Sequence, residues 1–370
     1  MFLEFFSFAR HHIGHMDERP EAFSPSKRSL GHLIRVGVVF LTIVAGLTVA
    51  TQLTDWALDR VMPTNGPVAY GTTFSSTYAQ SLGLDWKKAY VAVLDDLDIR
   101  QLRIPAYWEE IEPSPGQFDF SDVDWQVTEA SKRGAKVVLA IGMKLPRWPE
   151  CHLPAWLQGA DVSGVHGMAL AMIEAVVRHY HDDSSVVSWQ VENEPFLPFG
   201  LCPKPDPAFL KAEVDLVREL DSSRPITMQD AGEFSTWVPT AKYADTLGVS
   251  LYRIVWDKRL GYVQWPGIPA AYKLRAAWAL RYCKEVINTE MQAEPWTTEG
   301  ITAVPIQRQL KQMNPGQLES NLRFARRIGF TDIYFWGVEW WYWLKQQGYP
   351  EMWNEGKKVI AQAHSYALNH

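Results

Sequence analysis

Two glutamates stand at the ends of strand-like runs, where their side chains could carry out acid–base chemistry. Glu194 follows the largely apolar run Val187–Val191 and directly precedes Pro195, and Glu290 closes a run that begins at Val286. Proline cannot donate to a sheet ladder, so Pro195 marks the end of its strand. Two carboxylates facing each other across a cleft can hydrolyse a glycosidic bond, one as the proton donor and the other in its ionised form.

Two further carboxylates compete for these roles. Glu294 also precedes a proline, which makes it a rival to Glu290, although Glu290 is favoured because it directly ends the apolar run. Glu192 lies two residues before Glu194, and strand alternation points it to the same side. We expect Glu192 to be an acid of the sheet interior rather than a reacting group.

Other polar or aromatic residues also fall near predicted strand ends, namely Arg103, Tyr252 and Trp336. Each has an alternative that involves no chemistry. Arg103 could be a structural ion-pair partner, Tyr252 could pack in the core, and Trp336 belongs to an aromatic run that is mostly packing. These residues are candidates because α/β barrels build their sites at the carboxyl ends of the strands.

Strand-like and helix-like patterns alternate eight times after Met62–Pro67, a run of turn-forming residues. Short, Val- and Ile-rich strands that alternate with helices indicate a parallel sheet, and eight such units are what an α/β (β/α)8 TIM barrel requires. An open doubly wound sheet is the alternative, but no Gly-x-Gly-x-x-Gly or Walker loop supports it. The predicted strands are Val68–Phe74, Ile99–Tyr107, Ala135–Ile141, Val186–Glu194, Ile226–Gln229, Leu247–Tyr252, Val286–Glu290 and Asp332–Trp336.

Composition limits the possible classes of function. The chain has 370 residues, of which 47% are hydrophobic and 21% charged, and its net charge of −6 without a basic stripe argues against nucleic acid as a partner. The three cysteines have no zinc-binding spacing. Serine-hydrolase, zinc-protease and nucleotide-binding motifs are also absent from the sequence. We therefore expect no metal and no cofactor.

An apolar segment near the N-terminus predicts a membrane anchor. Residues 33–53 approach the roughly 20 residues that span a bilayer, and basic residues (Lys27, Arg28, Arg35) lie before or at the start of the segment. This asymmetry predicts a cytoplasmic tail (1–32), a signal anchor (33–53), a linker (54–67) and an extracytoplasmic barrel (68–370). A cleaved signal peptide and a buried core helix are the alternatives. An oxidising compartment would permit a Cys151–Cys202 disulfide.

Three motifs together resemble those of clan A glycoside hydrolases. They are the stretch Arg103–Asp124, which resembles the strand-two arginine and its following loop, the triplet Asn193-Glu194-Pro195, and the pair Thr289-Glu290. The chain is similar in this respect to the cellulase-type family 5, with similarity to families 39 and 42. The resemblance extends from about Tyr70 to the C-terminus.

The resemblance implies a carbohydrate substrate and a retaining mechanism on a β-linked oligo- or polysaccharide. Glu194 would be the general acid and then the general base, and Glu290 would be the nucleophile that forms a glycosyl-enzyme. Retaining enzymes hold these two carboxyl groups about 5–5.5 Å apart. Two alternatives use the same barrel: a transglycosylase with the same pair, and a non-catalytic carbohydrate-binding or scaffolding protein.

The resemblance also implies roles for four neighbours of the pair. Asn193 would hydrogen-bond the sugar 2-hydroxyl, Tyr252 would donate to Glu290, Arg103 would keep Glu290 ionised, and Trp336 would form the floor of the −1 subsite. The third predicted strand departs from the pattern, because it is followed by a stretch that contains Lys144 and lacks the histidine found in many family 5 members. The sugar and the linkage therefore stay open.

Overall fold

The computed structural model describes residues 27–61, 66–257 and 259–369, and it divides the chain into two units, Met1–Leu53 and Thr54–His370. Most of the predicted cytoplasmic tail, residues 1–26, lies outside the described residues, as do residues 62–65 of the predicted linker. Each unit is described by itself.

Helix α1 (Lys27–Val61) contains the predicted anchor and continues into the segment expected to be a linker. Its stretch Arg35–Leu58 has 24 residues and a mean hydropathy of 2.0, and none of its most apolar window is buried. The hydroxyls of Thr42 and Thr48 each donate to the carbonyl four residues earlier, at 2.8 Å. By its length and composition, and with these hydroxyls bonded within the helix, the segment is suited to crossing a bilayer.

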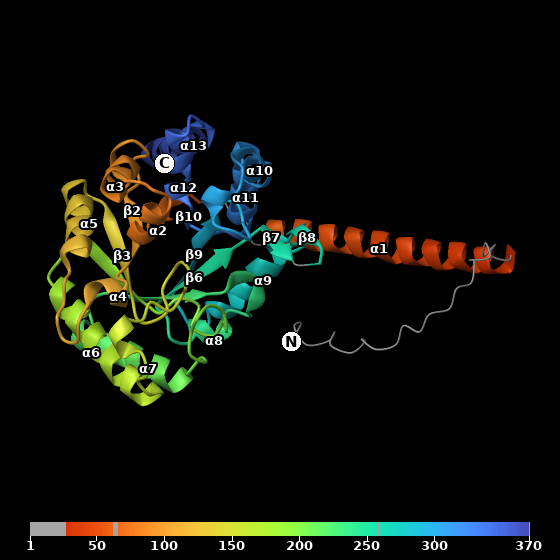
Figure 1. The fold of residues 1–370 in the computed structure, drawn as a ribbon. Coiled ribbons are helices and arrows are strands. Elements are labelled where there is room, and N and C mark those ends of the chain that lie inside the picture. The colour runs from red at the N-terminus through yellow and green to blue at the C-terminus, as the bar shows by residue number, and fades with distance from the viewer. Residues whose placement is uncertain (1–26, 62–65, 258, 370) are drawn as a thin grey trace, which may run out of the picture. The chain divides into compact units, whose positions relative to one another are not determined.

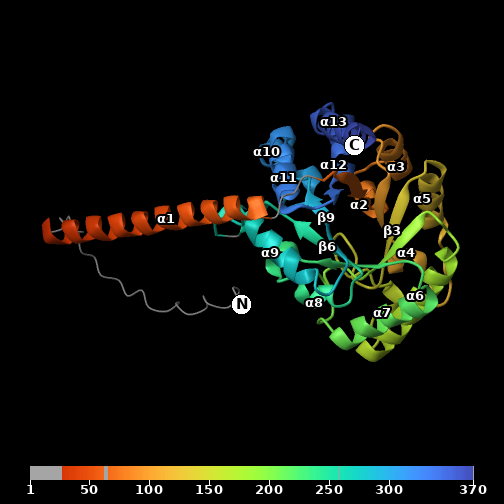
Figure 2. The ribbon, with the colours of Figure 1, turned by 180° about the vertical axis from the view of Figure 1, so that it is seen from behind.

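Eight parallel strands form a closed barrel in the order β1-β10-β9-β6-β5-β4-β3-β2, which confirms the predicted TIM barrel. Figures 1 and 2 show the barrel from opposite sides, with helices outside the ring of strands. The strands are β1 (Ala69–Thr73), β2 (Gln101–Pro105), β3 (Lys136–Ile141), β4 (Val186–Val191), β5 (Ile226–Asp230), β6 (Thr246–Leu251), β9 (Glu285–Gln292) and β10 (Asp332–Trp336).

Several helices begin at side-chain caps or at prolines. Asp206 accepts hydrogen bonds from the amides of Ala208 and Phe209, and Pro207 occupies the first turn. The α-helices of the barrel unit, with the three short 3₁₀ helices left out, are α2 (Ser76–Ser81), α3 (Trp86–Asp95), α4 (Trp108–Ile111), α5 (Ser121–Lys132), α6 (Val162–Tyr180), α7 (Pro207–Leu220), α8 (Val238–Ala241), α9 (Pro269–Ala279), α10 (Ile306–Gln312), α11 (Pro315–Ile328), α12 (Val338–Gln346) and α13 (Glu351–Asn369).

Some strand boundaries differ from the predicted ones because of the local backbone conformation. Strand β4 ends at Val191 rather than at Glu194, because Glu192 and Glu194 have φ angles of 58° and 46° that leave the extended region. An antiparallel hairpin, β7 (Ile254–Asp257) and β8 (Gly261–Gln264), follows β6 and was not predicted.

Strand β9 carries an irregularity at the position of Glu290. Its register shifts against β10 between Ile333 and Phe335, and against β6 between Val249 and Ser250. An extra residue of this kind turns the following side chain to a new direction, and bulges recur beside active sites. The shift places Glu290 opposite Ser250 across the β6–β9 ladder.

Two glycines at the ends of strands leave room for buried carboxylates. Gly142 after β3 has φ 124°, and a Cβ there would lie 2.5 Å from Oε1 of Glu192. Gly337 after β10 has φ 118°, and a Cβ there would lie 2.5 Å from Cβ of Glu294. A side chain is unfavourable at both positions for conformational and for steric reasons.

Candidate active site

The carboxylate of Glu290 is contacted by three side chains that come from β2 and from β6 or its end. Arg103 on β2 donates from Nη1 to Oε1 at 2.7 Å, Tyr252 after β6 donates from its hydroxyl to Oε2 at 3.0 Å, and Ser250 lies 3.4 Å from Oε2. Glu290 is 3% exposed. Fixed donors on both oxygens leave this carboxylate oriented and paired with a cation.

Arg103 lies inside the barrel with no exposed surface and distributes its donors over four side chains. It donates to Gln190 Oε1 at 2.6 Å, to Asn193 Oδ1 at 2.6 Å and to Thr73 Oγ1 at 3.2 Å, besides Glu290. A buried charge is tolerated when it is paired and hydrogen-bonded in this way. The arginine therefore connects the carboxylate of Glu290 to the amide of Asn193.

Glu194 differs from Glu290 in that no cation among the described residues pairs with its carboxylate. Ser250 donates to its Oε1 at 2.6 Å, and Lys144 donates to its backbone carbonyl at 3.0 Å instead of to the side chain. Burial, followed by the neighbouring charge of Glu290, raises the pKa of Glu194 to about 7, and the Ser250 hydrogen bond opposes the rise. A carboxyl with this pKa can hold a proton near neutral pH and release it again.

The hydroxyl of Ser250 fixes the two carboxylates close together. Its oxygen lies 2.6 Å from Glu194 Oε1 and 3.4 Å from Glu290 Oε2, so the sum of these distances, 6.0 Å, is an upper limit on the separation of the two oxygens. Retaining glycosidases have a separation of about 5–5.5 Å and inverting ones about 6.5–9.5 Å. The arrangement fits the shorter spacing. Sequence reasoning missed Ser250, although a hydroxyl two residues before Tyr252 on the same strand was a usable signal.

Glu192 lies beneath the site in a structural position. Its two oxygens accept from the amides of Met143 and Lys144, both at 2.7 Å, and its carboxyl also shares a hydrogen bond with Glu213 on α7. Burial raises the pKa of Glu192. This carboxyl organises the loop after β3, in agreement with the expectation that it is an interior acid.

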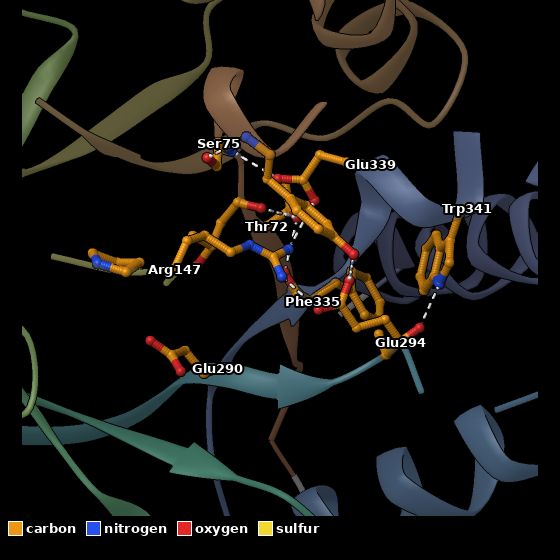
Figure 3. Close-up of polar contacts among 12 residues, drawn as sticks. Thr72, Ser75, Arg147, Glu290, Glu294, Phe335, Glu339 and Trp341 are labelled. Carbon is orange, nitrogen blue, oxygen red and sulfur yellow. Dashed lines mark hydrogen bonds and ion pairs between the residues drawn. The ribbon is translucent and has the colours of Figure 1, made fainter. Parts of the chain in front are cut away.

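Glu294 lies in a second carboxylate pair that is bridged by an arginine (Figure 3). Arg147, in the loop after β3, is ion-paired with Glu294 and with Glu339, the latter at 3.3 Å. The hydroxyl of Tyr78 donates to Glu294 at 2.9 Å, and the amide of Ser75 donates to Glu339 at 2.7 Å. Sequence reasoning missed Arg147 and Glu339, although Glu339 follows shortly after the end of β10 and the strand-end rule could have found it.

Trp336 lies at the end of β10 against this second pair. Its ring is 8% exposed, and the guanidinium carbon of Arg147 lies 4.0 Å from the ring centroid. Arg147 also lies 3.6 Å from the ring centroid of Tyr78, so the guanidinium is stacked on both rings. One face of the indole is therefore covered, and only the other face could meet a ligand.

A third acid approaches the Glu194–Glu290 pair from the loop after β3. Burial and the charges of Glu194 and Glu290 raise the pKa of Glu150 to about 8, and its carboxyl hydrogen-bonds to Asn193. The next residue, Cys151, forms a disulfide with Cys202, which fixes this loop to the one after β4. Among residues 27–61, 66–257 and 259–369, no cluster of three or more His, Cys, Asp or Glu is placed to hold a metal ion.

Comparison with known proteins places this barrel among glycoside hydrolase folds. No family model matches the chain. A curated β-galactosidase of Xanthomonas manihotis is 30% identical over 132 residues, which cover 31% of this chain and 20% of that protein. The β-galactosidase of Marinomonas ef1 superposes with a TM-score of 0.53 and 15% identity, covering 82% of this chain and 60% of that one.

Structures of glycoside hydrolase families 5 and 42 superpose equally well. The GH5_18 protein of Bifidobacterium longum gives a TM-score of 0.53 at 13% identity, over 73% of this chain and 70% of that one. A catalytic mutant of a GH42 β-galactosidase from G. stearothermophilus gives 0.53 at 13% identity, over 73% and 51%. The chain thus spans a fifth of the curated relative and about three fifths of the Marinomonas enzyme. Its structural neighbours are family 5 and family 42 glycoside hydrolases, with which it shares the barrel.

Proposed function

We propose that this barrel is a retaining glycoside hydrolase that cleaves β-linked oligo- or polysaccharides by double displacement. The observation that carries the proposal is the difference between two carboxylates that share one hydroxyl. Glu290 is paired with the guanidinium of Arg103, whereas Glu194 has a raised pKa and no cation on its carboxylate. Two acids whose environments separate their proton affinities are what an acid/nucleophile pair needs.

In the first step Glu290 would attack the anomeric carbon while Glu194 gives its proton to the leaving oxygen. The bond from the anomeric carbon to the leaving oxygen breaks, and an ester bond to Glu290 forms. Tyr252 and Arg103, which hold the two oxygens of Glu290, would keep the attacking oxygen in place. Positioning of this kind accounts for a large part of the rate enhancement in reactions between bound groups.

In the second step Glu194, now ionised, would take a proton from water as the water attacks the same carbon. The ester to Glu290 breaks, and the sugar leaves with its original configuration. The raised pKa of Glu194 suits both halves of this cycle, because the group must be protonated in the first step and accept a proton in the second.

Asn193 and Trp336 are the proposed contacts to the sugar. The side-chain oxygen of Asn193 accepts from Arg103 and its amide contacts Glu150, so one remaining N–H can reach a 2-hydroxyl. The face of Trp336 that Arg147 leaves open would form the floor of the −1 subsite. Both contacts would lie beside the Glu194–Glu290 pair.

We place the barrel outside the cytoplasm, attached by α1. Lys27, Arg28 and Arg35 lie before or at the start of the candidate span, which favours a cytoplasmic N-terminus. The Cys151–Cys202 disulfide supports this orientation, because such bonds persist in oxidising compartments.

The test is hydrolysis of a panel of aryl β-glycosides, with azide rescue of two variants. The panel includes β-galactosides and β-mannosides, for which structural neighbours are named. With an activated aryl glycoside, Glu194→Ala should accumulate the glycosyl-enzyme, and azide should release a β-glycosyl azide. Azide should replace the missing nucleophile in Glu290→Ala and give the α-glycosyl azide.

The configuration of the azide products separates the possible outcomes. Opposite configurations from the two variants support both assignments. Wild-type protein that is inert on every glycoside, while still binding sugars, would replace the proposal with a carbohydrate-binding barrel. If Glu294→Ala gives the α-azide and Glu290→Ala does not, the nucleophile has been misassigned.

A further inference from the structure

The outward side of α9 and of the turn after it is apolar. Leu274, Trp278, Leu280 and Tyr282 are 46%, 55%, 47% and 51% exposed, and we call these four side chains the α9 patch. An outer helix of a barrel normally turns its polar side to water. Large apolar side chains gathered on one exposed element mark a surface that contacts a partner or a membrane.

The outer helices α7 and α11 show the usual arrangement. Lys211 and Asp215 form an ion pair on the outward side of α7, and Arg323 and Glu319 form one on α11 at 3.3 Å. The α9 patch is thus a local feature and does not reflect the composition of the whole outer layer.

Basic side chains surround the α9 patch. Arg281 is exposed within it, the ammonium nitrogen of Lys242 lies 5.6 Å from the ring centroid of Tyr282, and Lys284 is 81% exposed and paired with Asp245 at 3.1 Å. Tryptophan, tyrosine and leucine combined with arginine and lysine are typical of protein surfaces that lie at the headgroup level of a bilayer.

The start of α9 lies beside the segment that leads into the barrel unit. Within the unit Thr54–His370, the side chain of Asp55 accepts a hydrogen bond from the amide of Ala270 at 3.1 Å and forms an ion pair with Arg327 on α11. Asp55 belongs to the last turns of the helix that contains the candidate span. The α9 helix therefore begins next to the last turns of that helix.

The connection to the barrel is also short. Helix α1 ends at Val61 and β1 begins at Ala69. Residues 62–68, even when fully extended, reach about 25 Å. A barrel on such a connection stays within about this distance of the bilayer surface.

We infer that the α9 patch rests on the lipid surface of the membrane in which α1 is anchored. Trp278 and Tyr282 lie at the headgroup level, Leu274 and Leu280 reach the upper acyl region, and Arg281 and Lys284 contact lipid phosphates. This inference rests on the proposed membrane anchor and is independent of the glycosidase activity. It fixes the rotation of the barrel on the membrane.

The test uses the full chain in nanodiscs of phosphatidylcholine and phosphatidylglycerol. An environment-sensitive fluorophore is attached at Arg281→Cys, beside the patch, and at Asp215→Cys on α7 as the matched control. Two of the native cysteines form the disulfide and Cys283 is buried, so the native cysteines should react little with the fluorophore. Unsubstituted protein treated in the same way measures the remaining background labelling. Lipids with a nitroxide high on the acyl chain then quench a fluorophore that lies at the bilayer.

We expect quenching at position 281 to be at least several-fold stronger than at position 215. Replacing both Leu274 and Trp278 by Ser should reduce this quenching. Equal quenching at the two positions would overturn the inference. A blue shift of the fluorophore at position 281 that increases with the number of chains per nanodisc, without nitroxide quenching, would also overturn the inference. The α9 patch would then be a contact between two copies of the chain. A protein without glycosidase activity would leave each of these readouts unchanged.

Discussion

Two buried carboxylate pairs lie at the mouth of this barrel, and the group that bridges each pair distinguishes them. Glu194 and Glu290 are bridged by the hydroxyl of Ser250, whereas Glu294 and Glu339 are bridged by the guanidinium of Arg147. A guanidinium placed between two carboxylates attracts both groups and keeps them in one geometry. A hydroxyl compensates neither charge, so the first pair keeps its capacity to exchange a proton.

A raised pKa does not by itself identify the reactive pair. Burial raises the pKa of Glu339 to about 7, against the opposing effect of Arg147, and burial raises that of Glu194 to a similar value. The distinguishing feature is geometric, because Glu194 has a second carboxylate at the same hydroxyl and no guanidinium. Burial alone perturbs structural and catalytic acids alike.

The largest effect should come from Glu290→Gln. We expect kcat/KM on aryl glycosides to fall on the order of 10⁵-fold, as for removal of a covalent nucleophile. Stability should fall as well, because the buried Arg103 loses the carboxylate that pairs with its charge, although Gln190, Asn193 and Thr73 stay as acceptors and the repulsion of Glu194 is relieved. The measurements are steady-state kinetics and denaturant unfolding. A variant that keeps more than a tenth of the activity would contradict the assignment.

Glu294→Gln should lower stability but leave the activity of the folded protein largely intact. Loss of one carboxylate leaves the buried Arg147 partly uncompensated, which should lower the free energy of unfolding by about 3 kcal/mol. Activity of the folded protein should stay within about tenfold of wild type, since the Glu194–Glu290 pair is intact. Urea unfolding followed by tryptophan fluorescence measures the first quantity. Undiminished stability together with lost activity would make Glu294 the functional acid.

The smallest expected effect is a shift in the pH dependence of activity. Activity should fall as pH rises through about 7, because Glu194 then loses the proton that it must donate. The Ser250 hydrogen bond lowers the pKa of Glu194, so Ser250→Ala should raise this pKa and move the alkaline limb of the kcat/KM profile to higher pH. A limb that stays in place, or moves to lower pH, would show that Glu194 does not control it.

The sequence supported the prediction of the barrel and of its strand-end residues because these depend on local patterns. Alternating apolar strands and helices predicted the fold, and Glu290 and Tyr252 occupy the predicted strand ends within a residue or two. The structure brings Arg103 and Tyr252 into contact with Glu290, as the resemblance implied, and it also brings Asn193 into contact with Arg103. Their catalytic and binding roles remain predictions.

The arginine-bridged pair could not be predicted from local patterns. Arg147 and Glu294 come from the loops after β3 and β9 and Glu339 from the first turn of α12, and Arg147 itself has a φ of 86° that its residue type does not favour. Their meeting depends on how the loop after β3 folds over the mouth. The unpredicted bend at Glu192 has the same origin, since tertiary hydrogen bonds hold its positive φ.

The Cys151–Cys202 disulfide also determines which fragments stay covalently linked after the chain is cut. Cys151 and Cys202 are 51 residues apart and enclose α6 and β4, so one complete helix and strand lie within a covalent ring. The exposed stretch Gln158–Asp161 lies inside that ring. A protease that cuts there would leave two fragments joined through sulfur, with the loop of Glu150 still tied to the segment after Glu194.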